Sequence, residues 1–452
     1  MTTFAALRES TATDLRLSEI LSALSYALDI TEGQPEGHSV RTCLIGMRIA
    51  QGAAVPPAQR GALFYALLLK DLGCSSNAAR LCSLFGADDR GLKRDHRLTD
   101  WSSPLASLAY ALRHAAPEAS PMARVLRVAS LGAKEQGAGR AMTQTRCDRG
   151  AEIAALLGFT AATQDAIRSL DEHWDGRGQP LGLRGDAIPL LGRIVGLAQT
   201  VEVYASTFGV DAAMSIAAER RGTWFDPLLV DGLRSFRRDH GFWSTVLGPD
   251  PRAELSAIEP EEQVLMADEA ALDVIAQAFA RVIDAKSPYT FRHSEGVADF
   301  AEAIGRARGF APDELRDLRR AGLLHDIGKL GISNRILDKP GRLSEVETTQ
   351  VRLHPAFTQR ILERVKAFRG IVDIASGHHE RLDGKGYHRG LSAAELCPLT
   401  RVLAVADVCE ALTADRPYRA AMPWEQVLGI LRKEAGKGLC AESVEALATT
   451  RL

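Results

Sequence analysis

The chain of 452 residues is long enough for two to four domains of ordinary size. Its 46% hydrophobic and 25% charged residues are typical of globular proteins, and a net charge of −2 gives no support to a protein that binds nucleic acid or an anionic membrane. The seven scattered cysteines form no C-x-x-C pair, and neither a signal-peptide pattern nor a run of 18 apolar residues occurs. We therefore expect a cytoplasmic protein without a disulfide framework and without membrane spans.

Helical patterns dominate the chain, because Ala, Leu, Arg and Glu fill long stretches and strand-like alternation is scarce. We predict an all-α fold, with clear helices over 17–28, 270–282, 296–307 and 314–325. The segment 241–260 interrupts this periodicity and contains Gly248-Pro249-Asp250-Pro251, which favours turns. The expected organisation is a first domain over 1–240, a linker over 241–261 and a second domain over 262–452.

Two spacings recur in the two halves of the chain. The first is a His-Ser pair followed 32 residues later by a tetrapeptide that ends in glycine: His38 and Lys70-Asp71-Leu72-Gly73 in one half, His293 and His325-Asp326-Ile327-Gly328 in the other. The second is an Asp-Gly pair followed 24 residues after its Asp by a polar residue: Asp175 and Gln199, then Asp383 and Asp407. We interpret the halves as diverged copies of one helical domain, with a longer middle in the first copy.

The second half gathers five of the eleven histidines beside carboxylates, in this order: His293, His325-Asp326, His354, His378-His379 and Asp407. A lone histidine on a helix is usually a core residue, but five within 87 residues indicate a metal site. Imidazole and carboxylate without thiolate suit Fe, Mn, Zn, Ni or Co, and seven ligands are too many for one ion but suitable for two. Asp326 could bridge such a pair, and Lys329 would lie on the same helical face, where its ammonium could hold a phosphate oxygen.

These residues, together with the string His378-His379-Glu380-Arg381-Leu382-Asp383-Gly384-Lys385-Gly386-Tyr387, resemble the HD-GYP domain of the HD phosphohydrolase superfamily. The resemblance extends over about 262–447. It implies an all-α, metal-dependent phosphodiesterase that cleaves cyclic di-GMP to the linear dinucleotide and, in some members, to GMP. A partner-binding role or a homodimer is also consistent with the resemblance.

The resemblance assigns roles to individual positions. It implies one metal set of His293, His325, Asp326 and Asp407, and a second of Asp326, His354, His378 and His379. Two ions are expected, Fe or Mn, with Zn, Ni or Co as alternatives; Tyr289 stands where some relatives have a glutamate for a third ion. Catalytic roles fall to Asp326 and Lys329, and contacts with the substrate to Lys329, Asp383, Arg416 and Arg419.

One departure from the family pattern lies in the loop Gly386-Tyr387-His388, where the signature proline is replaced by histidine. Because proline fixes φ and removes a donor, its loss should loosen the loop without deleting a metal ligand. His388 could be a further ligand, although a loop histidine facing solvent is the alternative. In the family this loop is associated with protein partners and substrate access, so those properties are the ones placed in doubt.

The first copy keeps His38 and Asp71 but has lost the other ligand types. It has Lys70 for His325, Leu170 for His378, Asp171 for His379 and Gln199 for Asp407. A lysine ammonium repels a cation and leucine offers no lone pair, so no dinuclear centre is expected there. We interpret this half as a degenerate HD-like domain retained for dimerisation, sensing or regulation, or simply as a scaffold.

Three functional readings follow from the sequence. The first is hydrolysis of cyclic di-GMP. The second keeps the metals but changes the chemistry, to another cyclic dinucleotide or nucleotide ester, or to oxidation at a diiron site. The third is a weakly active or inactive module that binds cyclic di-GMP or a protein partner. No glycine-rich phosphate loop, catalytic triad motif or long basic cluster supports a nucleotide-fold enzyme or a nucleic-acid binder.

Overall fold

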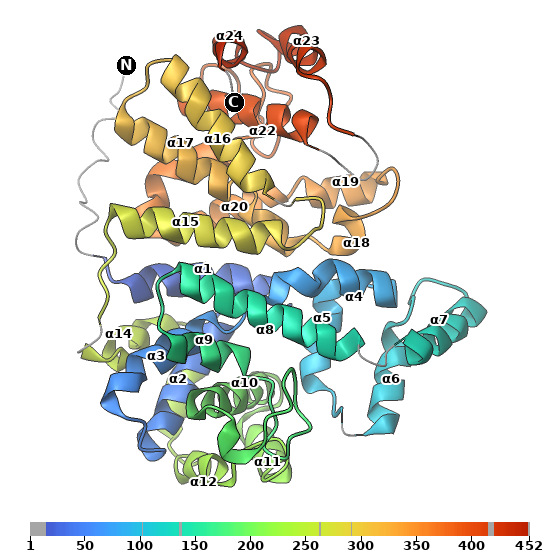
Figure 1. The fold of residues 1–452 in the computed structure, drawn as a ribbon, viewed down its shortest axis with the longest axis vertical. Helices are drawn as coiled ribbons and strands as arrows, with labels where there is room; N and C mark the ends of the chain where they lie inside the picture. Colours follow the sequence, from blue (N-terminus) through green and yellow to red (C-terminus); the bar gives the residue numbers. More distant parts are fainter. Residues whose placement is uncertain are drawn as a thin grey trace.

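The computed structural model describes residues 15–101, 103–134, 138–261, 264–290, 292–414 and 420–450. Every regular element in these ranges is a helix, with only isolated β-bridges beside them, so the predicted all-α fold is confirmed. Figure 1 shows two helical bodies stacked along the long axis of the molecule, the N-terminal half below and the C-terminal half above. None of the helices in the described ranges is long and apolar enough to cross a lipid bilayer.

The first half consists of short and medium helices. In chain order they are α1 (Leu17–Thr31), α2 (His38–Gly52), α3 (Pro57–Leu69), η3 (Cys74–Asn77), α4 (Ala78–Phe85), α5 (Asp89–Leu98), α6 (Pro104–His114), α7 (Pro121–Lys134), α8 (Ala138–Leu156), α9 (Ala161–Arg168), η4 (Gly185–Ala187), α10 (Leu190–Phe208), α11 (Val210–Glu219) and α12 (Pro227–Ser235). The helices α4 to α7 account for the longer middle of this copy, and α6 and α7 extend to one side of the body in Figure 1.

The segment predicted as a linker is folded and packs onto the first half. It contains α13 (His240–Val246), η5 (Pro251–Glu254) and α14 (Leu255–Ile258). Trp243, Val246 and Leu255 are buried there, and the Glu259 carboxylate accepts hydrogen bonds from Ser18 and Tyr65 of the first half. Apolar side chains within the turn-rich segment therefore hold it against the first body.

The second half begins with α15 (Glu269–Asp284). It continues with α16 (His293–Ala307), α17 (Pro312–Leu324), η7 (Ile327–Gly331), α18 (Asn334–Leu337), α19 (Glu345–Val351), α20 (His354–Leu362), η8 (Lys366–Ile371), α21 (Val372–Ser376), α22 (Pro398–Thr413), α23 (Trp424–Glu434) and α24 (Ala441–Thr449). The helices α16, α17, α21 and α22 pack on one another, and their inward faces form a core of Ala, Val, Leu and Ile.

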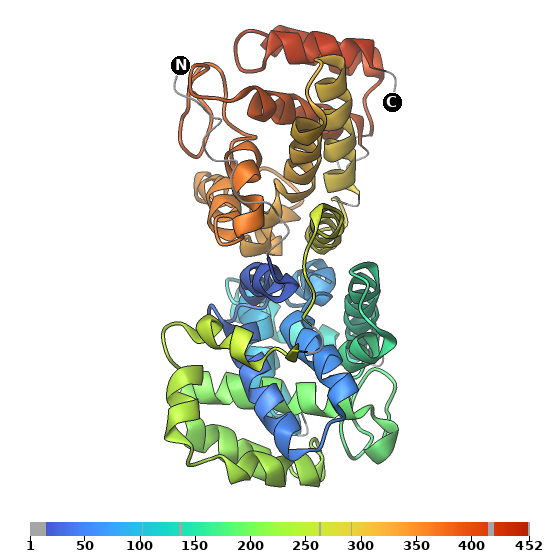
Figure 2. The same ribbon diagram turned by 90° about the vertical axis from the view of Figure 1, so that its left-hand side faces the viewer.

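The two halves meet through α1 and α15, which lie between the bodies in both views (Figures 1 and 2). A buried ion pair crosses this boundary, with Lys286 Nζ 3.4 Å from Asp89 Oδ2. The other oxygen of Asp89 accepts a hydrogen bond from the backbone N–H of Asn334, at the start of α18. The first half is thus in direct contact with α18, which comes soon after the His-Asp doublet in the chain.

The predicted helices of the second half are confirmed, but the His-Asp doublet does not lie within one helix. The helix α17 ends at Leu324, and His325 and Asp326 connect it to the 3₁₀ helix η7. Residues three apart eclipse each other in a 3₁₀ turn, so Lys329 still reaches Asp326. The predicted proximity is therefore correct, although the local geometry assumed for it was wrong.

Candidate metal centre

All seven side chains proposed as ligands converge at one place in the second half. They are supplied by the ends of several helices: His293 opens α16, His325 and Asp326 follow α17, His354 opens α20, His378 and His379 follow α21, and Asp407 lies within α22. Six are buried, and His379 is partly exposed. Because each residue lies at a helix end or on an inward helix face, packing of the core brings residues far apart in sequence into one cluster.

Asp326 lies between two groups of imidazoles. Its Oδ1 is 3.3 Å from Nε2 of His354 and 3.8 Å from Nε2 of His378. Its Oδ2 is 3.3 Å from Nε2 of His325 and 3.5 Å from Nε2 of His293. Each carboxylate oxygen therefore faces a different pair of ring nitrogens, as expected of a carboxylate that bridges two ions.

Asp407 closes the cluster from α22. Its Oδ1 lies 3.6 Å from Nε2 of His293 and 3.8 Å from Nε2 of His325. Its Oδ2 lies 3.8 Å from Nδ1 of His379. The side chains of the two implied sets therefore lie around Asp326 in one cluster, and their division between two ions stays a prediction.

Three of the histidines are oriented in the same way by the backbone. In each, Nδ1 donates to the carbonyl three residues earlier, which leaves Nε2 as the lone-pair nitrogen that faces the cluster. The distances are 2.7 Å from His325 to Gly322, 2.7 Å from His354 to Val351 and 2.6 Å from His378 to Ala375. No pattern in the sequence indicates this arrangement, which follows from the position of each histidine at the end of a helical turn.

A fourth histidine is oriented by a carboxylate that sequence reasoning missed. Nδ1 of His293 contacts Oε2 of Glu410, one turn after Asp407 on α22. The first half repeats this contact between Nδ1 of His38 and Glu202. Comparing the two copies beyond their ligand positions would have identified Glu410, since both glutamates follow the Asp407-equivalent position by three residues.

Two buried polar atoms of the cluster lack the hydrogen-bond partner that a buried group requires. Nε2 of His325 and Oδ1 of Asp326 are buried and have no hydrogen-bond partner among the described residues. Burial lowers the pKa of His354 to about 3, and it lowers the pKa of His378 as well, so both rings are neutral and their Nε2 lone pairs face each other across 3.2 Å. The facing lone pairs of these two neutral imidazoles and the ionised carboxylates of Asp326 and Asp407 are donors that suit a divalent cation, so the residues fit a metal centre.

Lys329 and the loop residues differ in how they relate to the cluster. Nζ of Lys329 contacts Oδ2 of Asp326, so this predicted catalytic side chain lies at the centre. The carboxylate of Asp383 instead pairs with Arg381 at 3.0 Å and accepts from the backbone N–H of Lys385, contacts that organise its own loop.

Two further predicted substrate contacts, Arg416 and Arg419, lie outside the described residues. The altered loop itself lies beside the cluster, with the Tyr387 ring 4.8 Å from the ring of His379. Nε2 of His388 is 3.0 Å from Oε1 of Gln359. Among the described residues, His388 is in none of the groups of side chains that lie close enough together to share a metal ion.

In the first half, the ammonium of Lys70 lies between His38 and Asp71, the counterparts of His293 and Asp326. Nζ of Lys70 donates to Nε2 of His38 at 2.8 Å and also contacts Asp71. The two retained ligands are thus joined by a side-chain cation. Glu202 holds the other nitrogen of His38, so the ring has no free lone pair.

A second ion pair fills the other part of the same site. A Cβ added to Gly328 would lie 1.9 Å from the carbonyl oxygen of His354, and a Cβ added to Gly73 would lie 1.9 Å from that of Arg146. This shared close approach identifies Arg146 as the counterpart of His354. Arg146 pairs with Asp171, the residue at the position of His379.

One further acidic group in the first half carries no metal site. Glu32, Asp71 and Cys74 lie close enough together to share an ion. However, Glu32 is paired with Lys93 at 3.3 Å and with Arg97 at 2.9 Å, and Arg97 also reaches Asp71 at 3.1 Å. Side-chain cations already neutralise these carboxylates.

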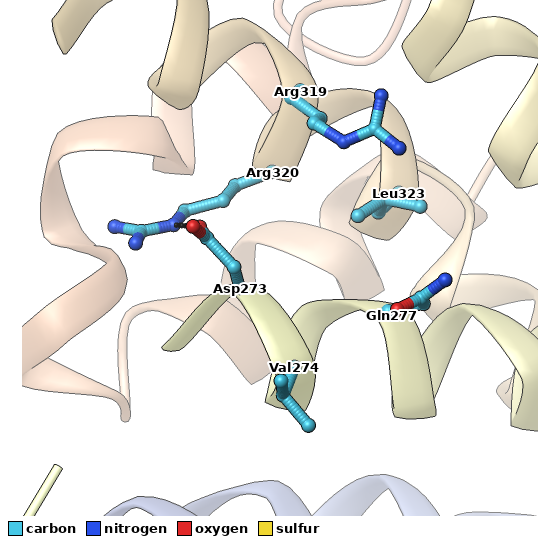
Figure 3. Close-up of a pocket in the computed structure, with 6 residues that line it drawn as sticks. All are labelled: Asp273, Val274, Gln277, Arg319, Arg320 and Leu323. Carbon is cyan, nitrogen blue, oxygen red and sulfur yellow. Dashed lines mark hydrogen bonds and ion pairs between the residues drawn. The ribbon is translucent and has the colours of Figure 1, made fainter. Parts of the chain in front are cut away.

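A small hollow between α15 and α17 is unrelated to the cluster (Figure 3). Arg319 pairs there with Asp299, and Arg320 pairs with Asp273. Because both guanidiniums are already neutralised by carboxylates, this hollow lacks free charge for an anionic ligand.

The fold and the cluster together define a helical protein with a histidine- and aspartate-lined centre suited to divalent cations. Comparison with known proteins places the chain in a family with this kind of fold. A family model described as HD domain matches residues 134–229 and 277–440, which takes in part of both halves. The chain belongs to the HD-domain family, and within it to the HD-GYP group.

Some relatives resemble this chain over nearly its whole length, and others over a part of it. A 3′3′-cGAMP-specific phosphodiesterase 3 of Vibrio cholerae is 41% identical over 95% of this chain and 94% of that protein. A crystal structure of a cyclic GMP-AMP specific phosphodiesterase of V. cholerae superposes with a TM-score of 0.64 at 37% identity, covering 96% of this chain and 97% of the other. A cyclic di-GMP phosphodiesterase of Pseudomonas aeruginosa is 42% identical over 29% of this chain and 32% of its own length.

Proposed function

We propose that this protein is a metal-dependent phosphodiesterase that hydrolyses a cyclic dinucleotide to the linear dinucleotide, with 3′3′-cGAMP as its substrate. The observation that carries this proposal is the Asp326 carboxylate, whose oxygens each face two imidazole nitrogens. Such an arrangement supports two ions that share one bridging ligand. We propose Fe or Mn for these ions, since hard and borderline divalent metals suit imidazole and carboxylate donors.

Divalent ions held in the cluster would stabilise negative charge on the phosphoryl oxygens. They would also lower the pKa of a water molecule, which could then lose a proton and attack phosphorus as hydroxide. The chain's own residues set up this chemistry. The backbone carbonyls and Glu410 fix the orientation of the histidine rings, so these rings need to move little when a metal ion binds. The side chain of Lys329 is 23% exposed and next to Asp326, where its ammonium can hold a nonbridging phosphate oxygen as charge develops.

The extent of similarity favours 3′3′-cGAMP over the cyclic di-GMP that the family resemblance implied. The relative named for 3′3′-cGAMP matches both halves, whereas the cyclic di-GMP phosphodiesterase of P. aeruginosa matches less than a third of the chain. Cyclic di-GMP remains the second candidate because of that local similarity. Both candidates are cyclic dinucleotides with two purines and two phosphodiester groups.

We further propose that the first half is a degenerate copy that binds no metal. The support for this is that side-chain cations occupy the places of metal ions. Lys70 bonds to both His38 and Asp71, and Arg146 forms an ion pair with Asp171. A regulatory or dimerising role for this half stays a prediction, as do a homodimer and protein partners of the loop 386–388.

Comparing three substrates tests this proposal. We expect metal-loaded protein to cleave 3′3′-cGAMP with a higher kcat/KM than cyclic di-GMP, and to produce a linear dinucleotide. Cyclic di-AMP serves as the control for purine preference. A higher kcat/KM for cyclic di-GMP would replace the proposed substrate, and cleavage of none of the three would refute the proposed activity.

A further inference from the structure

Beside the proposed ligand His379, the side chains of Tyr387 and Arg352 lie in a row that leads from the centre to solvent. The ring of Tyr387 lies 4.8 Å from the ring of His379 and 6.5 Å from that of His354. On the same tyrosine, Cζ of Arg352 is 5.2 Å from the ring centroid. Arg352 follows the end of α19, two residues before His354, and is exposed, whereas Tyr387 is partly buried. A guanidinium is thus held at the edge of the cluster.

The charge of this guanidinium is not neutralised by the protein. No carboxylate among the described residues lies within ion-pair distance of Arg352. By contrast, two arginines of the loop that contains Tyr387 are paired: Arg381 with Asp383 and Glu434, and Arg389 with Asp373. Lys329, the other cation beside the cluster, already contacts Asp326. Among the described residues, Arg352 is therefore a cation beside Tyr387 that remains available to an incoming anion.

A cyclic dinucleotide presents such an anion, because it carries two phosphodiester groups and only one can be cleaved at a time. The phosphodiester being cleaved belongs at the histidine and aspartate cluster. We propose that Arg352 binds the other, uncleaved phosphodiester and so positions the substrate; this inference rests on the proposed function. The planar guanidinium suits bidentate contact with phosphate oxygens, and stacking on Tyr387 restricts its orientation before the substrate arrives.

A purely structural role for Arg352 makes a different prediction. A cation at a helix C-terminus can interact favourably with the helix dipole, and Arg352 is at the end of α19. Loss of that interaction would change stability or all activities together. Binding of the second phosphodiester would instead affect only substrates that have one.

The test compares Arg352→Ala and Arg352→Lys with wild-type protein on two substrates. One is 3′3′-cGAMP, with two phosphodiesters, and the other is bis(p-nitrophenyl) phosphate, with one. For Arg352→Ala we expect KM for 3′3′-cGAMP to rise roughly 10- to 100-fold, the loss expected for one charge-assisted contact, with little change in kcat. Arg352→Lys should recover part of this loss, because it keeps the charge but not the planar fork. Cleavage of bis(p-nitrophenyl) phosphate should be unchanged in both variants.

Ionic strength supplies a second readout, and a remote arginine supplies the control. KM of the wild-type protein for 3′3′-cGAMP should rise more steeply with salt than KM of Arg352→Ala, because the variant has lost an exposed charge interaction. Arg432→Ala, which removes an exposed guanidinium paired with Glu445 on α24, should behave as wild type.

The outcomes separate this inference from the proposed function. Cleavage of 3′3′-cGAMP by wild-type protein with an unchanged KM in Arg352→Ala would overturn the inference alone. Equal losses on both substrates would overturn it in favour of a structural role. No cleavage of any cyclic dinucleotide by metal-loaded wild-type protein would refute the proposed function, and this inference with it.

Discussion

Replacing Glu410 with alanine should weaken metal binding while leaving the fold largely intact. Glu410 holds Nδ1 of His293, and this contact directs Nε2 toward Asp326 and Asp407, at 3.5 and 3.6 Å. Loss of a carboxylate that orients a metal-binding histidine typically costs 10- to 100-fold in metal affinity, which is about 1.4 to 2.7 kcal/mol. The histidine itself remains, so metal should still bind, but more weakly.

The first half provides a matched control in Glu202, which makes the same contact with His38. Because the ammonium of Lys70 already bonds to the other nitrogen of that ring, Glu202→Ala should not change metal binding. It should instead destabilise the protein, because Glu202 also accepts from Nε of Arg41 at 2.6 Å and both side chains are buried. Leaving such a charge unpaired costs about 3 to 5 kcal/mol, or on the order of 10 °C in Tm.

The assay measures both properties in each variant. Protein is equilibrated with buffered Mn(II) over a range of free concentrations, bound metal is quantified by mass spectrometry, and Tm of the metal-free protein is recorded by circular dichroism. We expect Glu410→Ala to lose metal affinity with a small change in Tm, and Glu202→Ala to show the opposite pattern. Unchanged affinity in Glu410→Ala, or equal losses of affinity in the two variants, would refute the reasoning.

Three further predictions concern the centre and the boundary between the halves. Asp326→Ala should abolish hydrolysis with little change in helical content by circular dichroism; retained turnover with a normal metal content would contradict its bridging role. Lys70→Ala should leave the bound metal unchanged in a metal assay, whereas a loss of metal would show that the first half holds an ion. Asp89→Asn should leave Lys286 buried without its charge partner, at a cost of about 3 to 5 kcal/mol in denaturant unfolding. Burial alone would raise the pKa of Asp89, but Lys286 and other partners lower it to about 2, below the unfolded value of 3.8. The stability difference from wild type should therefore be constant above about pH 5 and shrink by roughly 2 kcal/mol as the pH falls to 2, and a difference that does not shrink would contradict this assignment.

The helical class and the set of clustered side chains could be predicted from the sequence. Period and composition determine helices locally, and a doublet such as His378-His379 beside carboxylates is rare enough to stand out. Helix ends, together with the inward face of α22, place these residues in one cluster. Their role as ligands remains a proposal.

The residues that support the cluster could not be predicted in the same way. Glu410 is an ordinary glutamate on a helix until the fold places it against His293, more than a hundred residues away. Arg146 was missed because the extra helices of the first half change the register between the copies, so only the shared close approach at Gly73 and Gly328 aligns it with His354. Arg352 was missed because its contact with Tyr387 depends on the path of two loops.

The most direct test of the central claim is product formation from 3′3′-cGAMP by protein purified without oxygen, with bound metal quantified in the same sample. The account predicts no product from metal-free protein, linear dinucleotide in proportion to the Fe(II) or Mn(II) bound, and no requirement for dioxygen. Turnover by protein that contains no divalent metal, or no product from protein with its centre loaded, would contradict it.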